Sequence, residues 1–266
     1  MTKRYAVIGD PVAHSLSPLM HAGWMADHGI DATYEAHLLR SDDPVAAIRA
    51  LTQYAGMNVT VPHKEAAAKA ADGYEGDVAN VLRREDDGSL SAYNTDGAGF
   101  LDSLDEAAPG WRGRVKRALI LGAGGAAQAI AGVLSPCVEA IVVANRTRSR
   151  AEEVFATLPN GRVGDWSDLS QSFAAADLIV QTTTLGMAGT ESPDWPLDAC
   201  GAETIVVDIV YRPLETPLLA AARARGLKTI DGLGMLIHQG ARAFEIWFGV
   251  KPDTAKARAR LEAALA

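Results

Sequence analysis

Short apolar segments alternate with helix-like segments along almost the whole chain, and this alternation restricts the fold more than any other feature of the sequence. The segments Arg117–Leu121, Ala140–Ala144 and 178–182 are apolar almost throughout, as expected of strands that are buried on both faces. Helix-like segments such as 126–134 lie between them. This order of strand, helix and strand predicts a parallel sheet with helices on both faces, which is an α/β fold.

The alternation of strand-like and helix-like segments becomes regular near residue 100 and ends near residue 232, which predicts two α/β domains. A chain of 266 residues is long enough for two domains of medium size. Before the first change, two strands at 78–84 and 90–93 flank Asp86-Asp87-Gly88 and predict a hairpin. We expect one domain to comprise residues 1–98 and 233–266, with the C-terminal helices packed on it. The other should comprise residues 99–232.

Several helix ends can be predicted from single residues. Ser17 and Pro18 suit the N-cap and first position of a helix over 18–28. A second helix is expected over 44–54. Ser149-Arg150-Ala151-Glu152 has the pattern of a capping box at the start of a third helix.

Composition argues against several classes of partner. The formal net charge is −8 and no long basic run occurs, so nucleic acid is not an expected partner. No apolar stretch is long enough to span a bilayer, and the N-terminus lacks the apolar region of a signal peptide. Cys137 and Cys200 lie in no metal-binding pattern, and the six histidines form none, so no metal is expected. We therefore expect a cytoplasmic protein.

A glycine-rich turn follows the strand Arg117–Leu121 and opens a helix. The residues are Gly122, Ala123, Gly124, Gly125, Ala126 and Ala127, which fit the pattern G-x-G-x-x-[G/A] of dinucleotide sites. The first glycine permits the tight turn, the second lets the backbone approach a pyrophosphate, and the final alanine allows close packing on the sheet. Phosphates bind at helix N-termini, although a tight structural turn explains the glycines equally well.

The residues after the next strand indicate which dinucleotide binds. Sites for NAD usually carry an acidic residue there for the ribose 2′-hydroxyl. This chain has Asn145-Arg146-Thr147-Arg148-Ser149-Arg150 instead. A guanidinium pairs well with a 2′-phosphate, so the run favours NADP(H), with Arg146 and Arg150 as the preferred contacts. The alternative is a solvated basic loop that caps the helix through Thr147 or Ser149.

Three polar runs are candidates for a substrate site. Ser15 and Ser17 precede a helix, where donors suit a carboxylate, although an ordinary N-cap also explains Ser17. Lys64 follows Asn58, Thr60 and Pro62 and falls in a first helical turn, where a cation is disfavoured unless it meets a negative charge, although a solvent-exposed lysine is a common alternative. A third run, Asn94-Thr95-Asp96-Gly97, precedes another helix and could be a simple cap.

Taken together and in this order, these runs resemble the shikimate dehydrogenase family. The matching segments span nearly the whole chain: Ser15-Leu16-Ser17-Pro18, Asn58-Val59-Thr60-Val61-Pro62-His63-Lys64, Asn94-Thr95-Asp96-Gly97, Gly122-Ala123-Gly124-Gly125-Ala126, Asn145-Arg146-Thr147 and Asp231-Gly232-Leu233-Gly234-Met235-Leu236-Ile237-His238-Gln239. Three positions depart from the usual pattern. The helix before Asn80 is short, Tyr93 replaces a frequent Asp, and Gln181 stands where Asn is common.

The resemblance implies a substrate domain followed by a Rossmann-type NADP(H)-binding domain, with a cleft between them. It implies reversible NADPH-dependent reduction of 3-dehydroshikimate to shikimate, a step toward chorismate and the aromatic amino acids. Lys64 and Asp96 would be the catalytic pair. Substrate would contact Ser15, Ser17, Asn58, Thr60, Asn80, Tyr211 and Gln239. Cofactor would contact the glycine-rich turn together with Asn145, Arg146, Thr147, Arg150, Thr182, Gly232 and Met235.

Alternatives remain within and outside this enzyme class. A quinate/shikimate dehydrogenase of broader specificity that uses NAD is the nearest, and an aminoshikimate enzyme or a methylenetetrahydrofolate dehydrogenase is more distant. A non-catalytic NADP-binding module would need neither Lys64 nor Asp96. Family members occur as monomers or homodimers, so either state is expected.

Overall fold

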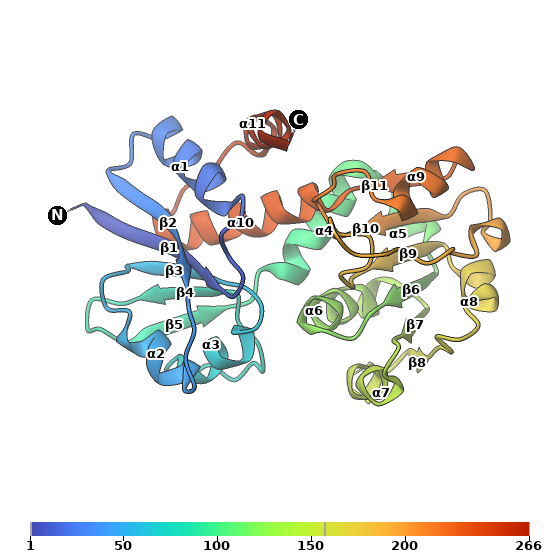
Figure 1. Cartoon of the computed structure of the whole chain (residues 1–266), viewed down its shortest axis with the longest axis horizontal. Coiled ribbons are helices and arrows are strands. Elements are labelled where there is room, and N and C mark those ends of the chain that lie inside the picture. Colours follow the sequence, from blue (N-terminus) through green and yellow to red (C-terminus); the bar gives the residue numbers. More distant parts are fainter. Residues whose placement is uncertain (1, 157, 266) are drawn as a thin grey trace. The chain divides into compact units, whose positions relative to one another are not determined.

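The computed structural model describes residues 2–156 and 158–265 and divides into two compact units (Figure 1). The first unit comprises the chain up to Thr95 together with Gln239–Ala264, and the second comprises Asp96–His238. The chain leaves the first unit between Thr95 and Asp96 and returns to it within helix α10 (Gly232–Phe248). The units therefore divide three residues before the expected boundary at 98 and six residues after the expected boundary at 232.

The first unit is built on a mixed five-stranded sheet in the order β2-β1-β3-β4-β5. Strands β1 (Lys3–Gly9), β2 (Ala32–Leu38) and β3 (Gly56–Val59) are parallel. Strands β4 (Val81–Arg84) and β5 (Leu90–Tyr93) form an antiparallel hairpin, as the sequence predicts. Gly88 has a φ of 87° in the turn between them, a conformation that suits glycine.

Helices cover both faces of this sheet (Figure 1). On one face, α2 (Pro44–Ala50) and α3 (Lys64–Ala70) bury Ile48, Ala67 and Ala70 against Ile8 and Met57. The other face is covered by α1 (Ser17–Asp27) and the C-terminal half of α10, which bring aromatic rings onto Tyr5 and Tyr34. The last helix, α11 (Thr254–Leu265), follows Asp253, whose carbonyl accepts a hydrogen bond from the Trp24 indole.

The second unit has a six-stranded sheet, parallel throughout, in the order β11-β10-β9-β6-β7-β8. The strands are β6 (Arg117–Leu121), β7 (Ala140–Ala144), β8 (Gly161–Val163), β9 (Leu178–Gln181), β10 (Ile205–Asp208) and β11 (Lys228–Ile230). The helices are α4 (Asp96–Ala107), α5 (Trp111–Arg114), α6 (Gly125–Leu134), α7 (Arg148–Ala156), α8 (Ser170–Ala175) and α9 (Pro217–Ala224), with short 3-10 turns at Ser135–Cys137 and Leu197–Ala199.

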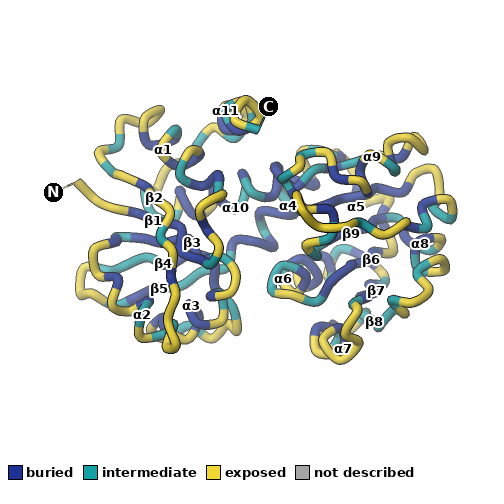
Figure 2. The backbone as a smooth tube through the Cα atoms, in the orientation of Figure 1, coloured by how far each residue is buried: buried dark blue, intermediate teal, exposed yellow. Residues whose placement is uncertain are grey.

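Alternate residues of these strands enter two separate apolar cores. Ile120 faces the core formed by α4, α5 and α6, whereas Leu121 faces the core formed by α8 and α9. The central strands are accordingly buried along their length (Figure 2). Burial on both faces explains why these strands are continuous apolar runs rather than alternating ones. The predicted α/β class and the parallel sheet are both confirmed. No helix within residues 2–156 and 158–265 is long and apolar enough to cross a membrane.

Three predictions of helix ends are wrong. Ser17 is the first residue of α1 rather than its cap, and the Ser15 hydroxyl accepts from the Ser17 backbone N–H at 3.2 Å. Helix α2 ends at Ala50, because the chain turns at Leu51 before β3. Helix α7 begins at Arg148, so Ser149 lies inside the helix, and Glu152 pairs with Arg148 instead of closing a capping box.

A buried histidine in the first unit makes stability sensitive to acid. His21 of α1 is fully buried against Tyr34, Trp24 and Phe244, and neither ring nitrogen has a hydrogen-bond partner among the described residues. Burial lowers the pKa of His21 from 6.5 to about 3, an effect that the nearby Asn58 side chain partly opposes. The folded protein therefore binds the His21 proton less well than the unfolded chain does.

Because burial lowers the pKa of His21 in the folded protein, the contribution of the neutral imidazole to the free energy of unfolding is fully present above pH 6.5. This contribution is lost as the pH falls toward 3. We expect His21→Leu to melt with a shallower pH dependence than the wild type between pH 6.5 and pH 4. His14→Leu, at an exposed position, is the control and should keep the wild-type slope. Equal slopes for His21→Leu and the wild type would show that the buried imidazole does not control this transition.

Candidate functional site

Polar side chains collect in the first unit near the carboxyl ends of its parallel strands. Ser15 lies in the loop after β1, and Ser17 opens α1 and is buried. Asn58 is near the end of β3 and is 6% exposed. Carboxyl ends of parallel strands are the usual ligand sites of α/β sheets, so this edge is the candidate substrate site of the unit.

Asn58 is held by side-chain hydrogen bonds from two directions. The Tyr34 hydroxyl donates to Asn58 Oδ1 at 2.7 Å, and Asn58 Nδ2 donates to the Asn80 carbonyl at 3.4 Å. Burial raises the pKa of Tyr34 well above 10, although a hydrogen bond from Ser17 acts in the opposite direction. The phenol therefore stays protonated and can donate at any physiological pH. Tyr34 is a site residue that sequence reasoning missed, because its strand alone gives no sign of this contact.

Asn80 joins three segments that are distant in the sequence. Its Nδ2 donates to Thr95 Oγ1 at 3.0 Å and to Gln239 Oε1 at 3.2 Å. Its Oδ1 accepts from the Thr95 backbone N–H at 2.8 Å, and the Thr95 hydroxyl also reaches the Gln239 carbonyl at 3.0 Å. The side chain is 2% exposed. The structure thus brings Asn80 and Gln239 together, as the matched runs imply, and adds Thr95 between them.

The two proposed reactive residues each begin a helix. Lys64 is the first residue of α3, and its carbonyl accepts from the Ala79 N–H at 2.9 Å. Asp96 is the first residue of α4 and is 5% exposed. Lys64 is thus tied to the residue before Asn80, while Asp96 follows the Thr95 that Asn80 binds.

The turn that leads to Lys64 is fixed by its own contacts. His63 is buried and donates from Nε2 to the Leu39 carbonyl at 2.9 Å, and its backbone N–H donates to the Thr60 carbonyl at 3.0 Å. The peptide bond between Val61 and Pro62 is cis. Thr60 packs over Gly9, where an added Cβ would lie 2.4 Å from its methyl carbon. The turn is therefore closely packed against the end of β1.

In the second unit the glycine-rich turn has the geometry that a pyrophosphate site needs. Gly122 has a φ of 115°, and an added Cβ would lie 2.4 Å from Thr182 Oγ1. Gly124 is the N-cap of α6, so no side chain occupies the start of this helix, and the space where a Cβ would stand is open. Gly125 has the same open space, and Ala127 is fully buried in the core. Backbone N–H groups at this helix end are suited to an anion.

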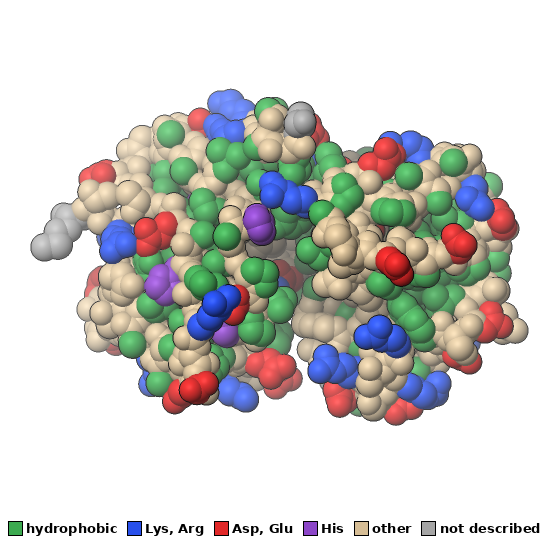
Figure 3. Space-filling view, in the orientation of Figure 1, with side chains coloured by type: hydrophobic (Ala, Val, Ile, Leu, Met, Phe, Trp, Pro, Cys, Tyr) green, Lys and Arg blue, Asp and Glu red, His purple; other side chains and the backbone are tan. Residues whose placement is uncertain are grey.

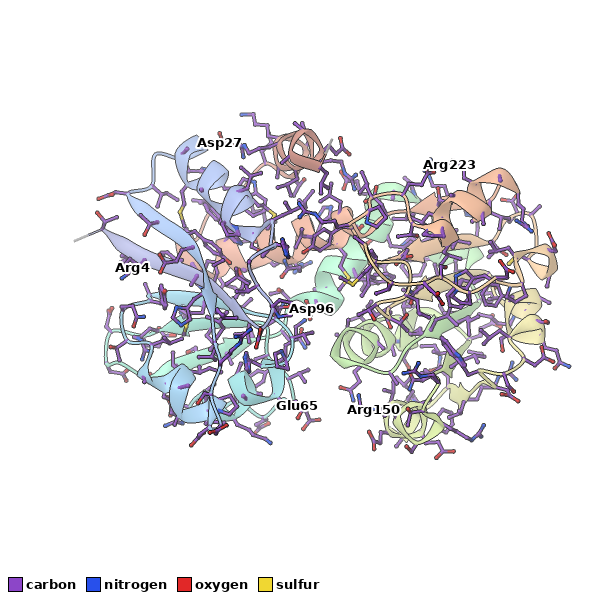
Figure 4. All side chains as sticks on the ribbon, viewed as in Figure 1. Arg4, Asp27, Glu65, Asp96, Arg150 and Arg223 are labelled. Carbon is purple, nitrogen blue, oxygen red and sulfur yellow. The ribbon has the colours of Figure 1, made fainter. Side chains whose placement is uncertain are left out.

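The basic run after β7 lies at the start of α7, where Lys and Arg side chains gather on the surface (Figure 3). The Asn145 side chain donates to the Thr147 carbonyl at 2.8 Å and shapes the turn. Arg148 is paired with Glu152 at 2.9 Å, whereas no carboxylate among the described residues pairs with Arg146 or Arg150. Both are exposed, and Arg150 projects from α7 (Figure 4). Two guanidinium groups are thus left to bind an anion.

Two buried polar residues at strand ends fix the loops of the second unit. Gln181 is fully buried and binds the backbone of Thr183 and Leu185, with Thr183 N–H donating to Oε1 at 2.6 Å. Asp208 accepts from Val210 N–H at 3.0 Å and from the Thr216 hydroxyl at 2.7 Å. Burial raises the pKa of Asp208 to about 6. Sequence reasoning did not single out Asp208.

The remaining candidates lie on the loops that these residues shape. Tyr211 follows Val210, and burial raises the pKa of its phenol. Gly232 begins α10, where an added Cβ would lie 2.2 Å from the Ile209 carbonyl oxygen. Met235 is buried in the core on the α6 side. Ser15, Ser17, Asn58, Thr60, Lys64, Asn80 and Gln239 thus belong to the first unit, and Asp96, Tyr211 and the cofactor candidates to the second.

No group of three or more His, Cys, Asp or Glu side chains within residues 2–156 and 158–265 is arranged to hold a metal ion.

The glycine-rich turn allows a paired test of stability and binding. Gly122→Ala forces a side chain into positive φ and against Thr182, so we expect a loss of about 1–3 kcal/mol in the free energy of unfolding. Gly124→Ala has a permitted φ of −90° and no steric conflict, so stability should be kept while NADPH affinity falls. Denaturant unfolding and a fluorescence titration with NADPH distinguish the two effects. Wild-type affinity in Gly124→Ala would place the pyrophosphate elsewhere.

Comparison with known proteins places this geometry in a family. Three family models match the chain: the shikimate dehydrogenase substrate binding domain over residues 7–81, shikimate/quinate 5-dehydrogenase over residues 108–192, and the shikimate 5′-dehydrogenase C-terminal domain over residues 232–262. The NADP(+)-dependent shikimate dehydrogenase of Azorhizobium caulinodans is 45% identical, and the match covers 94% of this chain and 92% of that protein.

Solved structures agree over the whole chain. Shikimate 5-dehydrogenase from Thermus thermophilus, in complex with NADP(H) and shikimate, matches with a TM-score of 0.86 at 35% identity, covering 99% of this chain and 100% of that one. Quinate dehydrogenase from Corynebacterium glutamicum, in complex with NAD, matches with a TM-score of 0.88 at 27% identity, covering 98% and 99%. The chain belongs to the shikimate dehydrogenase family.

Proposed function

We propose that this protein is an NADP-dependent shikimate dehydrogenase that reversibly reduces 3-dehydroshikimate to shikimate. The observation that carries the proposal is the 45% identity to an NADP(+)-dependent shikimate dehydrogenase over nearly the whole of both chains. The candidate site supports it, because Lys64 and Asp96 each begin a helix whose start is tied to the Ala79-Asn80 segment. The chain thus supplies an ammonium and a carboxylate at two helix starts, together with several groups that can bind hydroxyls.

Lys64 and Asp96 have complementary parts in this reaction. Bound NADPH supplies the hydride for the C3 ketone of 3-dehydroshikimate. Lys64 as an ammonium stabilises the negative charge that develops on the ketone oxygen and donates a proton to it. Asp96 accepts a hydrogen bond from a substrate hydroxyl beside the ketone. In the oxidation of shikimate the neutral Lys64 accepts the proton.

The other polar residues bind different groups of the substrate according to their own chemistry. Ser15 and Ser17 are hydroxyl donors at the N-terminus of α1 and suit the carboxylate. Asn58, Thr60, Asn80 and Gln239 bind ring hydroxyls or line the pocket, and Tyr211 lies near the carboxylate. This set of groups suits a small polyhydroxylated acid such as shikimate.

Cofactor contacts follow from the second unit. The backbone N–H groups of Ala123, Gly124, Gly125 and Ala126 bind the pyrophosphate. Arg146 and Arg150 pair with the 2′-phosphate, with Asn145 and Thr147 beside them. Thr182, Gly232 and Met235 contact the nicotinamide side. No carboxylate among the described residues pairs with Arg146 or Arg150 and so competes with the 2′-phosphate. The protein acts as a monomer or a homodimer.

The nearest alternative is a quinate/shikimate dehydrogenase of broader specificity that uses NAD. The match to a quinate dehydrogenase bound to NAD keeps it open. The absence of an acidic residue in the run 145–150 argues against it, because an NAD site usually carries a carboxylate for the ribose. A non-catalytic NADP-binding module is the third reading.

Substitution of Lys64 tests the catalytic role. We expect Lys64→Ala to lower kcat for shikimate oxidation by about 10²- to 10⁴-fold, the usual range for a lost general acid or base. Lys69→Ala, in the last turn of the same helix, is the matched control and should keep wild-type rates. The measurement is the absorbance of the NADPH or NADH formed, with shikimate or quinate as substrate and with NADP or NAD as cofactor.

The substrate pairs separate the three readings. Strong turnover of shikimate with NADP alone supports the proposal. Comparable turnover of quinate or with NAD replaces it with the broader enzyme. Tight NADP binding without turnover of any pair replaces it with the binding module.

The arginines give a second test. Arg146→Ala and Arg150→Ala should raise the KM for NADP by about tenfold or more, with little change in the KM for NAD, because each charge-assisted bond contributes about 1.5–3 kcal/mol. Arg148→Ala is the control, since Arg148 is already paired with Glu152. Equal effects of all three substitutions would show that the arginines attract NADP only through their general positive charge and not through a specific contact with the 2′-phosphate.

A further inference from the structure

Tyr34 lies on edge strand β2, two strands away from Asn58, yet its hydroxyl reaches Asn58. In the sheet, Tyr5 of β1 pairs with Tyr34 on one side and with Gly56 on the other, and Val7 pairs with Asn58. Tyr34 and Asn58 therefore point to the same face, and the phenol ring extends across β1. The ring is 8% exposed and stacks on His21 at 4.4 Å between centroids and 3° between planes. A ring packed in this way has little freedom to move its hydroxyl.

The contacts of Asn58 select one orientation of its carboxamide. Tyr34 donates to Oδ1 at 2.7 Å, and the Asn80 carbonyl accepts from Nδ2 at 3.4 Å. A flipped amide would place Oδ1 against the Asn80 carbonyl oxygen, and two acceptors repel each other. The buried Tyr34 hydroxyl thus fixes a residue to which the proposed function gives a substrate contact.

We propose that Tyr34 is a positioning residue of the substrate site: its hydroxyl fixes Asn58 so that Asn58 offers the N–H that the Asn80 carbonyl does not use, and never its carbonyl oxygen, to the bound substrate. The proposal rests on the proposed function, in which Asn58 binds a shikimate hydroxyl. It specifies the polarity of that contact, with the substrate oxygen as acceptor. Tyr34 itself touches neither substrate nor cofactor.

A double-mutant cycle in the full chain tests the proposal. Tyr34→Phe keeps the ring and its stacking and removes only the hydroxyl. We expect it to raise the Kd for shikimate, measured by calorimetry, and the KM for shikimate by about three- to tenfold. The KM for NADP should be unchanged and kcat should change by less than about twofold, since neither reactive group is moved. In the Asn58→Ala background, Tyr34→Phe should have no further effect on the Kd.

Tyr54→Phe is the matched control. Tyr54 is 1% exposed, and its hydroxyl binds Glu35 and His37, outside the candidate site. Its substitution should leave the shikimate Kd unchanged, and melting temperatures show whether each variant is folded. An unchanged Kd for shikimate in Tyr34→Phe would overturn the proposal. So would a Tyr34→Phe substitution that raises this Kd by the same factor whether or not the Asn58 side chain is present.

The dehydrogenase function and the role of Tyr34 can fail separately. A wild-type chain that binds shikimate without turning it over would remove the dehydrogenase function, while the calorimetric cycle would still decide the role of Tyr34. A wild-type chain that does not bind shikimate would overturn both.

Discussion

The buried carboxamide of Asn80 is the contact on which the first unit most depends. It binds Thr95 where the chain leaves that unit and Gln239 where the chain returns to it. Because the segment before it also binds the carbonyl of Lys64, the start of α3 is fixed by the same stretch of chain. A buried polar group that loses its partner is destabilising, so these segments have to stay together whenever the unit is folded. The same hydrogen bonds thus hold the candidate site together and join the two points at which the chain leaves and re-enters the first unit.

Much of the architecture could be predicted because the signals are local and repeated. Apolar runs in the second unit mark strands buried on both faces, and the turn at Gly88 marks the hairpin of the first. The glycine-rich turn could be placed because Gly122 needs positive φ and Gly124 needs open space. The helix ends were less predictable: Ser15 rather than Ser17 is the side-chain acceptor at α1, and Arg148 takes the Glu152 carboxylate that a capping box would use.

The parts that could not be predicted are side-chain contacts between distant segments. Tyr34 is 24 residues from Asn58, and Asn80 is 159 residues from Gln239. No periodicity connects such pairs, because their meeting depends on strand order and on which face of the sheet each residue occupies. The same holds for Asp208, whose carboxylate holds Val210 and Thr216 and so fixes the loop that carries Tyr211. Its role follows only from burial at a strand end.

The two crossings of the chain have a consequence for synthesis on the ribosome. The second unit is one continuous segment, Asp96–His238, whereas the first needs Gln239–Ala264 to complete the helix layer over its sheet. Domains generally fold as units during synthesis, at about 5–20 residues per second. The second unit can therefore become compact while the first, although made earlier, still lacks α11 and half of α10. The part of the first unit before Asp96 is thus made earlier than the second unit but completes its fold later, because the aromatic side chains on its sheet stay uncovered until Gln239–Ala264 has been made.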